Sequence, residues 1–280
     1  MLGAVAYAPK VVTIWEGFKD YFEKQGMPID YLLFSNYETQ VEALFNGQID
    51  SAWNSPLAAL RAERMGRSFN QPVHYGPMRD SDQNLTSVLV TQKKSAFQKP
   101  EDLSSIGFGA WDSPQARIIP LQHLSELGLH ENKNFRARLF DVLVGKHGDH
   151  IGGERDSALA MLANEVDACW MLDSNYEAFS KDGTLPASET RVLARTTHFD
   201  HCIFTYAPES ASGTSPEICE RFSNILLGMK WSDPQVRPLL ELEGLKEWRA
   251  GRTSGFSLLD KGIDLTSYYD KKGKVLAKTN

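Results

Sequence analysis

The sequence predicts an α/β protein of two similar lobes with a ligand cleft between them. The main observation is an internal repeat. Val41–Trp53 and Ala158–Trp170 each have the pattern of an amphipathic helix, a residue that ends the helix and a short buried strand. Gly47 and Asn164 supply the stops, and both residue types tolerate the left-handed conformation that ends a helix. The alternative is a single-domain enzyme in which one helix-strand unit recurs by chance.

The composition is that of a globular protein. A chain of 280 residues is long enough to form two lobes, each with its own core. The hydrophobic fraction of 41% and the charged fraction of 24% are ordinary values. The net charge is −6 and no long run of Lys or Arg occurs, so nucleic acid is not an expected partner. No apolar segment approaches the roughly 18 residues of a membrane span.

In the first lobe, helices are predicted where apolar residues recur at helical intervals, and strands where short apolar runs occur. Gly26 ends the first helix, and Asn54-Ser55-Pro56 begins the last one. The expected elements are a strand over 1–7, a helix over 11–23, a strand over 31–34, a helix over 37–46, a strand over 49–53 and a helix over 55–65.

The second lobe begins at a β-rich segment, 85–91, that is a candidate crossing between the lobes. The expected elements after it are a turn at 100–103, a strand over 106–109, a helix over 113–127, a strand over 137–144, a polar loop over 145–153, the second repeated helix and strand, and returning strands at 192–194 and 202–206. The tail from residue 215 has a helical pattern broken by prolines. We therefore expect residues 1–84 and 198–280 to form lobe 1, and residues 85–197 to form lobe 2.

Two features bear on the cellular compartment. Residues 1–7 already have the pattern of a core strand and leave no room for a secretory leader. The protein is therefore cytoplasmic if Met1 is the native start, and periplasmic if a leader has been removed. Cys169, Cys202 and Cys219 are odd in number and show no pairing pattern, which favours a reducing compartment.

A series of motifs extends over about residues 30–245. Tyr37 begins a helix that contains Val41-Glu42-Ala43 and reaches Gly47, and the following strand ends in Ile49-Asp50-Ser51-Ala52-Trp53. The series continues with Ser87-Val88-Leu89-Val90, with Phe108-Gly109 before Asp112 and Ser113, and with Val166-Asp167-Ala168. In order and spacing it resembles the periplasmic phosphonate-binding proteins of ABC importers. The resemblance implies the type II periplasmic-binding fold, in which two α/β lobes close over a small ligand.

The resemblance also implies where the ligand's anionic head lies, namely at the N-terminus of the second lobe's first helix. Free backbone N–H groups and the positive end of the helix dipole favour an anion there. In this chain the turn is Trp111–Ala116, in which Ser113 and Gln115 can donate but Pro114 has no N–H. A purely structural helix cap is the alternative. The turn is about two residues shorter than the family's, and Leu85 replaces a common aromatic residue, so we expect a small anionic or zwitterionic ligand that is phosphonate-like, sulfonate-like or a carboxylate.

Further binding residues are expected at the strand ends, because open α/β sheets bind ligands there. Tyr37 occupies the position of the family's ligand-contacting tyrosine, and three tryptophans fall at predicted strand ends where a planar ligand could stack. A surface tyrosine and core tryptophans are the structural alternatives. The residues expected to bind the ligand are Tyr37, Trp53, Asn54, Ser55, Trp111, Ser113, Gln115, Trp170 and Asp173.

Two His-x-Asp-His motifs, His147–His150 and His198–His201, hold four of the seven histidines. The resemblance implies a histidine for the anionic head near the first motif, although alignment of the following helix puts Glu154 at that position. It also implies that Asp200 meets the ligand's amine. His150, Glu154 and Asp200 therefore join the expected ligand-binding residues.

The same motifs suit a divalent transition metal, because clustered imidazoles and carboxylates match the preferences of Zn²⁺, Fe²⁺ or Mn²⁺. The candidate metal ligands are His147, His150, His198 and His201. Anion binding by histidine and exposed loop polarity are the alternatives. No cofactor is expected if the protein only binds a solute.

The sequence is compatible with two functions. The first is a solute-binding protein that serves an ABC permease or a sensor protein. The second is an enzyme on the same fold, of lyase, decarboxylase or cofactor-biosynthesis type, since a closing cleft also excludes water. Its candidate catalytic residues are His150, His201 and Glu154. A Cys202–His201 nucleophile pair is a further hypothesis, against which stands the common occurrence of buried cysteine in strands.

Overall fold

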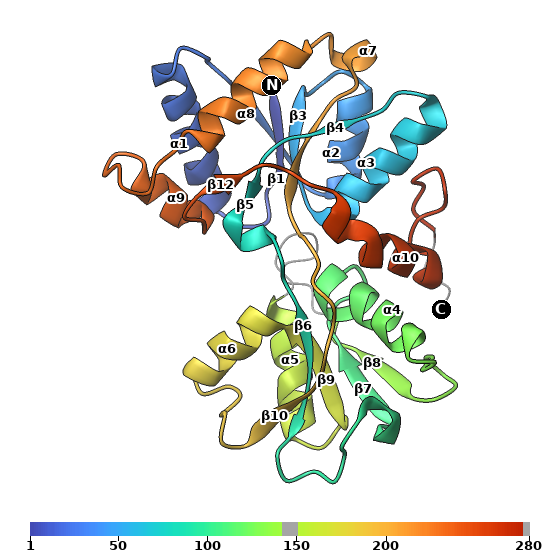
Figure 1. The fold of residues 1–280 in the computed structure, drawn as a ribbon. Helices are drawn as coiled ribbons and strands as arrows, with labels where there is room; N and C mark the ends of the chain where they lie inside the picture. Colours follow the sequence, from blue (N-terminus) through green and yellow to red (C-terminus); the bar gives the residue numbers. More distant parts are fainter. Residues whose placement is uncertain (142–150, 277–280) are drawn as a thin grey trace. The chain divides into compact units, whose positions relative to one another are not determined.

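The computed structural model describes residues 1–141 and 151–276, which form two compact α/β units (Figure 1). Unit 1 comprises residues 1–83, 200–256 and the described residues from 269 onward, and unit 2 comprises residues 84–199 and 257–268. Within the described ranges, no helix has the length and apolar character needed to cross a membrane.

The sheet of unit 1 has five strands in the order β2-β1-β3-β11-β4. β1 runs parallel to β2 and β3, whereas β11 runs antiparallel to β3 and β4. The strands are β1 (Leu2–Val5), β2 (Tyr31–Phe34), β3 (Ser51–Asn54), β4 (His74–Tyr75) and β11 (Ile203–Tyr206). A separate two-stranded sheet pairs β5 (Met78–Arg79) with β12 (Trp248–Arg249).

Two helices of unit 1, α2 and α3, begin at residues whose side chains accept a hydrogen bond from a free N–H group of the first turn. The side chain of Asn36 accepts from the Thr39 N–H at 2.8 Å to cap α2, and Ser55 accepts from the Ala58 N–H at 3.2 Å to cap α3. The helices are α1 (Lys10–Lys24), α2 (Tyr37–Phe45), α3 (Pro56–Phe69), α7 (Glu209–Ser212), α8 (Pro216–Leu227) and α9 (Arg237–Glu243), with 3₁₀ turns η1 (Asp80–Asp82) and η4 (Ser254–Phe256).

The sheet of unit 2 also has five strands, in the order β10-β6-β9-β7-β8. β7 runs parallel to β8 and β9, whereas β6 runs antiparallel to β9 and β10. The strands are β6 (Ser87–Gln92), β7 (Ser105–Phe108), β8 (Arg136–Leu139), β9 (Ala168–Leu172) and β10 (Thr190–Arg195). The helices are α4 (Ile119–Glu126), α5 (Ile151–Leu162), α6 (Asp173–Lys181) and α10 (Ser257–Thr266), with the 3₁₀ turn η2 (Pro100–Asp102) and the π-helical segment η3 (Pro114–Ile118).

The two sheets share one plan, which explains the sequence repeat. Each repeated strand, β3 or β9, lies in the middle of its sheet with one parallel and one antiparallel neighbour. The orders β2-β1-β3-β11-β4 and β8-β7-β9-β6-β10 correspond strand for strand. The predicted α/β class with two similar halves is therefore confirmed.

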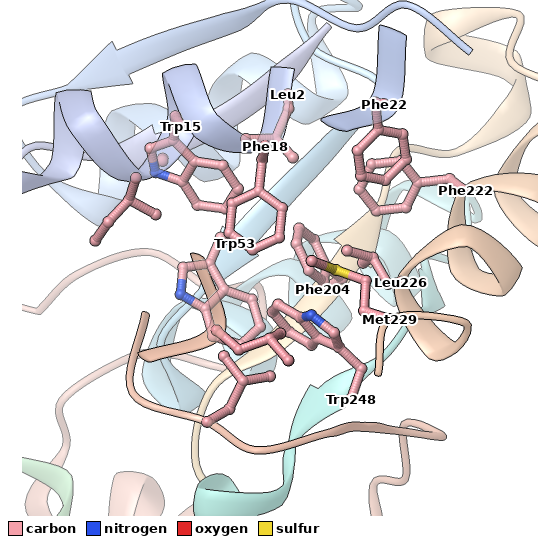
Figure 2. Close-up of a cluster of buried hydrophobic side chains, with 14 of the residues drawn as sticks. Leu2, Trp15, Phe18, Phe22, Trp53, Phe204, Phe222, Leu226, Met229 and Trp248 are labelled. Atoms are coloured by element: carbon pink, nitrogen blue, oxygen red, sulfur yellow. The ribbon is translucent and has the colours of Figure 1, made fainter. Parts of the chain in front are cut away.

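The cores lie on both faces of each sheet. In unit 1, Trp53 points into an aromatic cluster that includes residues of helices α1, α8 and α9 (Figure 2). The neighbouring Ala52 packs on the other face with α2. The rings of Phe22 and Phe222 stack at 4.8 Å. In unit 2, Trp170 packs on the α4 face and its neighbours in β9 pack on the α5 face. Central strands buried on both faces account for the short apolar runs in the sequence.

The start of one helix and the unit assignment of another segment differ from the sequence-based expectation. The helix expected over 113–127 begins as the π-helical η3, in which the Ile118 N–H donates to the Ser113 carbonyl at 3.0 Å. In a regular α-helix the Ala116 carbonyl would accept from the N–H of residue 120, but Pro120 has no N–H. The Gly109 N–H donates to the Ala116 carbonyl at 3.1 Å instead, so this α-helical hydrogen bond is absent. Residues 257–268, expected in lobe 1, belong to unit 2 because α10 packs on α4.

Candidate ligand-binding site

The turn before α4 in unit 2 forms a tightly packed helix start. The Ser113 hydroxyl is buried and accepts from the Ala116 N–H at 3.1 Å. A side chain at Gly109 would bring its Cβ within 2.7 Å of the Ala116 Cβ, so the turn requires glycine there. In the described part of the chain, no acceptor meets the Gln115 N–H. This helix start therefore offers a free donor and the positive end of the helix dipole to an anion.

Arg117 lies one turn into this helix and folds back onto Trp111. Its guanidinium carbon is 4.0 Å from the centre of the Trp111 ring, and Nη1 donates to the Trp111 carbonyl at 3.4 Å. The side chain is only 5% exposed, and burial lowers its pKa. Glu131 and Asp141 act on it electrostatically, but none of the described residues forms an ion pair with it. A buried cation without a paired anion is costly, and a bound anion would remove that cost.

Arg117 is not among the binding residues expected from the sequence. The residue falls within a predicted helix, and nothing in a single sequence separates a buried arginine from an exposed one at such a position. The one available signal was its spacing, since Arg117 follows Ser113 by one helical turn and can reach the same helix start.

Glu154 joins three helix starts in unit 2. It lies in the first turn of α5 and is fully buried. Its carboxylate accepts from Gln115 Nε2 at 3.1 Å, from the Leu172 N–H at 3.0 Å and from Asn175 Nδ2 at 2.8 Å. The structure thus brings the predicted residues Gln115 and Glu154 together. With its oxygens occupied, Glu154 positions Gln115 and the strand end.

Two other predicted residues of unit 2 are engaged by protein groups. Trp170 is fully buried and packs edge-on against His123 at 5.8 Å, because β9 is a central strand covered on both faces. Its ring has no exposed face for stacking. Asp173 begins α6, pairs with Arg195 and accepts from the Thr86 hydroxyl at 3.4 Å.

The predicted residues at the end of β3 build the strand-helix junction of unit 1. Trp53 is 7% exposed, with Phe204 at 4.8 Å and the Arg79 guanidinium 5.3 Å from its ring centre. Asn54 is fully buried and accepts from Gln40 at 2.8 Å. Ser55 caps α3. Each of these side chains therefore packs on or hydrogen-bonds to a neighbouring protein group, and none of them presents a free surface to a ligand.

Tyr37 is the remaining predicted binding residue of unit 1. It is the first residue of α2 and is only partly buried. Burial is the main cause that raises the pKa of its phenol well above the ordinary value, and neighbouring Cys202 and Tyr7 act in the same direction. The hydroxyl therefore stays protonated and can donate a hydrogen bond.

A buried charge cluster surrounds Arg79 in unit 1, another residue that sequence analysis missed. Arg79 binds Asp82 in bidentate fashion, with Nε–Oδ2 at 2.5 Å and Nη2–Oδ1 at 3.1 Å. Its Nη1 donates to the Glu243 carbonyl at 2.9 Å and lies 3.3 Å from Glu243 Oε1. Burial alone would raise the pKa of Asp82, but Arg79 and His201 lower it to about 2. Burial raises the pKa of Glu243 to about 7 despite the opposing effect of Arg79.

His201 and Cys202 adjoin this charge cluster. His201 Nδ1 lies 3.1 Å from Cys202 Sγ and 3.6 Å from Asp82 Oδ1. Burial lowers the pKa of His201, but Cys202 and Asp82 outweigh it and raise the pKa above its ordinary value. Within residues 1–141 and 151–276, these three residues are the one group with donor atoms close enough to hold a metal ion. Of the predicted metal ligands, His198 is exposed and is not part of this group, and His147 and His150 lie outside the described residues.

Asp200, predicted to bind a ligand amine, is instead paired with Arg252 of the same unit. Its side chain is 1% exposed and accepts from Arg252 Nε at 2.6 Å and Nη2 at 2.7 Å. Its N–H donates to the Gly255 carbonyl at 3.1 Å. A ligand amine would have to compete with a bidentate arginine pair.

Known proteins of the same two-unit α/β architecture are similar to this chain. The family described as "ABC transporter, phosphonate, periplasmic substrate-binding protein" matches residues 4–256. Among solved structures, PhnD1 from Prochlorococcus marinus in complex with methylphosphonate is similar at 16% identity, with a TM-score of 0.66 and coverage of 95% of this chain and 97% of that chain. XAC2383 from Xanthomonas citri bound to ATP is similar at 13% identity, with a TM-score of 0.67 and coverage of 94% and 96%. The periplasmic aliphatic sulphonate binding protein SsuA from Escherichia coli is similar at 15% identity, with a TM-score of 0.58 and coverage of 100% and 92%.

These structural similarities establish the fold, and the family match covers most of the chain. Together they favour solute binding over the enzyme that the sequence left as an alternative. The chain belongs to the phosphonate-type periplasmic substrate-binding protein family of ABC transporters.

Proposed function

We propose that this protein binds a small oxyanion, a phosphonate or sulfonate, with the anionic head at the start of the η3–α4 helix in unit 2. The observation that carries the proposal is Arg117, a buried cation with no carboxylate ion-paired to it in the described part of the chain. The helix dipole and the Gln115 N–H act in the same place. An oxyanion supplies the missing negative charge.

Phosphonates and sulfonates are the preferred candidates. One similar structure is a methylphosphonate complex and another is an aliphatic sulphonate binding protein. Both head groups are tetrahedral and present three oxygens, which suits several donors that converge from a helix start and a guanidinium. A carboxylate presents two oxygens in a plane and fills such a site less completely. We expect small carboxylates to bind more weakly.

We also propose Tyr37 as a ligand contact of unit 1. Its phenol is protonated and partly exposed, so it can donate to an oxygen of the ligand. Trp53, Asn54, Ser55 and Trp170 are proposed to act only through the structure that they support. The physiological setting proposed for the protein is the periplasm, with an ABC permease as its partner.

A thermal-shift panel tests the ligand class. The purified protein is heated with methylphosphonate, ethylphosphonate, methanesulfonate, ethanesulfonate, acetate, propionate and glycine, each at the same ionic strength. A ligand that binds only the folded state raises the melting temperature in proportion to the logarithm of its concentration. We expect phosphonates or sulfonates to give the largest rise. Equal shifts for all anions, or a rise with glycine alone, would count against this assignment.

A further inference from the structure

We propose that Asp82, His201 and Cys202 form a binding site for one divalent transition metal ion of the zinc class in unit 1. The site combines a carboxylate oxygen, an imidazole nitrogen and a thiol sulfur, and these donor atoms all lie within 4.8 Å of one another. Its residues differ from those of the anion site in unit 2, so the proposal stands or falls independently of the proposed function.

The donor spacing is close to that of a tetrahedral zinc centre. Zinc bonds of about 2.0–2.1 Å to nitrogen, about 2.0–2.2 Å to oxygen and about 2.3 Å to sulfur put pairs of donor atoms roughly 3.3–3.6 Å apart. Here the nitrogen lies 3.1 Å from the sulfur and 3.6 Å from the carboxylate oxygen. The third separation, between the carboxylate oxygen and the sulfur, is at most 4.8 Å. Side-chain shifts of up to about an ångström would therefore complete the tetrahedral geometry.

The backbone already holds the two ligand-bearing segments together. The His201 N–H donates to the Asp82 carbonyl at 2.8 Å, and two residues after Cys202 the Phe204 N–H donates to the Pro77 carbonyl at 3.1 Å. Asp82 is 2% exposed and Cys202 is 8% exposed, so their side chains have little freedom to lose on binding. A site fixed in this way needs little rearrangement to take an ion.

Arg79 gives the site its outer support. The guanidinium binds both oxygens of Asp82 and so fixes the carboxylate plane, as the hydrogen-bonding partners of metal ligands commonly do. The positive charge of Arg79 also opposes a nearby metal ion. We therefore expect affinity weaker than that of a closed structural zinc site, in the micromolar range.

The donor set selects the class of metal. Thiolate and imidazole ligands favour Zn²⁺ and Co²⁺, whereas Mg²⁺ and Ca²⁺ prefer oxygen ligands only. Three protein ligands leave the fourth tetrahedral position for water or an added anion. The site is therefore of the open type, and the metal could exchange on dialysis.

Cobalt titration of the reduced, tag-free, metal-free protein tests the proposal. We expect one Co²⁺ per chain, a near-ultraviolet thiolate-to-cobalt charge-transfer band, and intense visible bands of four-coordinate cobalt that Zn²⁺ abolishes. Cys202→Ser should remove the charge-transfer band, and Asp82→Asn should keep the band but weaken binding at least tenfold. Cys219→Ser is the matched control, because this half-buried thiol on α8 belongs to no such group among the described residues, and its loss should change nothing.

His201→Gln gives an independent variant that preserves a polar side chain, and it should weaken cobalt binding at least tenfold. The melting temperature of each metal-free variant checks that it folds. The absence of a charge-transfer band in the wild-type protein, or a band that persists in Cys202→Ser, would overturn the proposal. A band lost in Cys219→Ser would place the site elsewhere and overturn it equally.

Discussion

Glu243 shows how burial and charge compete at a single residue. Its side chain lies next to Arg79, yet burial raises its pKa to about 7 from an ordinary value of 4.5. The folded protein therefore binds a proton at this carboxyl at pH values where the unfolded chain has lost it. By linkage, the contribution of Glu243 to stability is fully present below about pH 4.5 and is lost as the pH rises through 7.

Replacement of Glu243 by Gln should therefore raise stability at pH 8 relative to the wild type. The amide keeps an acceptor for Arg79 without the buried charge, and the gain is up to ~3 kcal/mol. The gain should shrink toward zero at pH 5. Urea unfolding at both pH values measures it, with Glu241→Gln as control, an exposed carboxylate on the same helix. A gain equal at the two pH values would show that Glu243 does not titrate as described.

At the residue scale, sequence analysis could predict chemistry but not burial. Ser113, Gln115 and Glu154 were predicted as site residues, and the structure brings Gln115 and Glu154 into contact. Trp53 and Trp170 were predicted to face a cleft, but they pack in cores, since a strand's sequence does not reveal that both of its faces are covered. Arg79 and Arg117 were missed because buried arginines have no sequence pattern of their own.

At the element scale, the start of α5 depends on an unusually close approach. A Cβ at Gly153 would lie 2.5 Å from the Phe140 carbonyl oxygen and 3.3 Å from the Ala110 nitrogen. Both are main-chain atoms that cannot rotate away. At the adjacent Gly152, no described atom lies within 4 Å of such a Cβ. Packing therefore requires glycine at position 153, whereas position 152 has room for a side chain.

Gly153→Ala should therefore destabilise the protein by roughly 2 kcal/mol or more through overpacking. Gly152→Ala is the matched control and should be neutral or stabilising by up to ~1 kcal/mol, because alanine favours the helix. Chemical denaturation of both variants measures the difference. Equal effects of the two substitutions would contradict the close packing of Gly153 against the main chain at Phe140 and Ala110.

Most helices and strands could be predicted from the sequence, because their apolar periodicity is strong. The predicted helices over 11–23 and 37–46 correspond to α1 and α2 within a residue, and the strand over 31–34 is β2. The two-residue strands β4, β5 and β12 could not be predicted, since they are formed by pairing with distant segments. The π-helical η3 depends on a hydrogen bond from Gly109 that no local pattern encodes.

At the scale of the whole molecule, the internal repeat was the strongest guide. It predicted two halves of one plan, and the two strand orders correspond throughout. The assignment of residues 257–268 differed because the apolar face of α10 looks the same in sequence whichever unit it packs on. The series of motifs over residues 30–245 predicts the family that the family match shows. No single motif of the series is specific enough to do so.

The central claim is that Arg117 holds the charge of a bound oxyanion, and calorimetric titration with the best ligand of the thermal-shift panel tests it. We predict 1:1 binding by the wild type and a ~10- to 100-fold loss in Arg117→Gln, the effect of losing a charge-assisted hydrogen bond worth about 1.5–3 kcal/mol. Without ligand, Arg117→Gln should be at least as stable as the wild type, because it removes a buried cation that has no ion pair among the described residues. Arg138→Gln, which removes an exposed arginine paired with Glu165, should bind like the wild type. Equal affinity in Arg117→Gln, or no binding of any oxyanion by the wild type, would contradict the account.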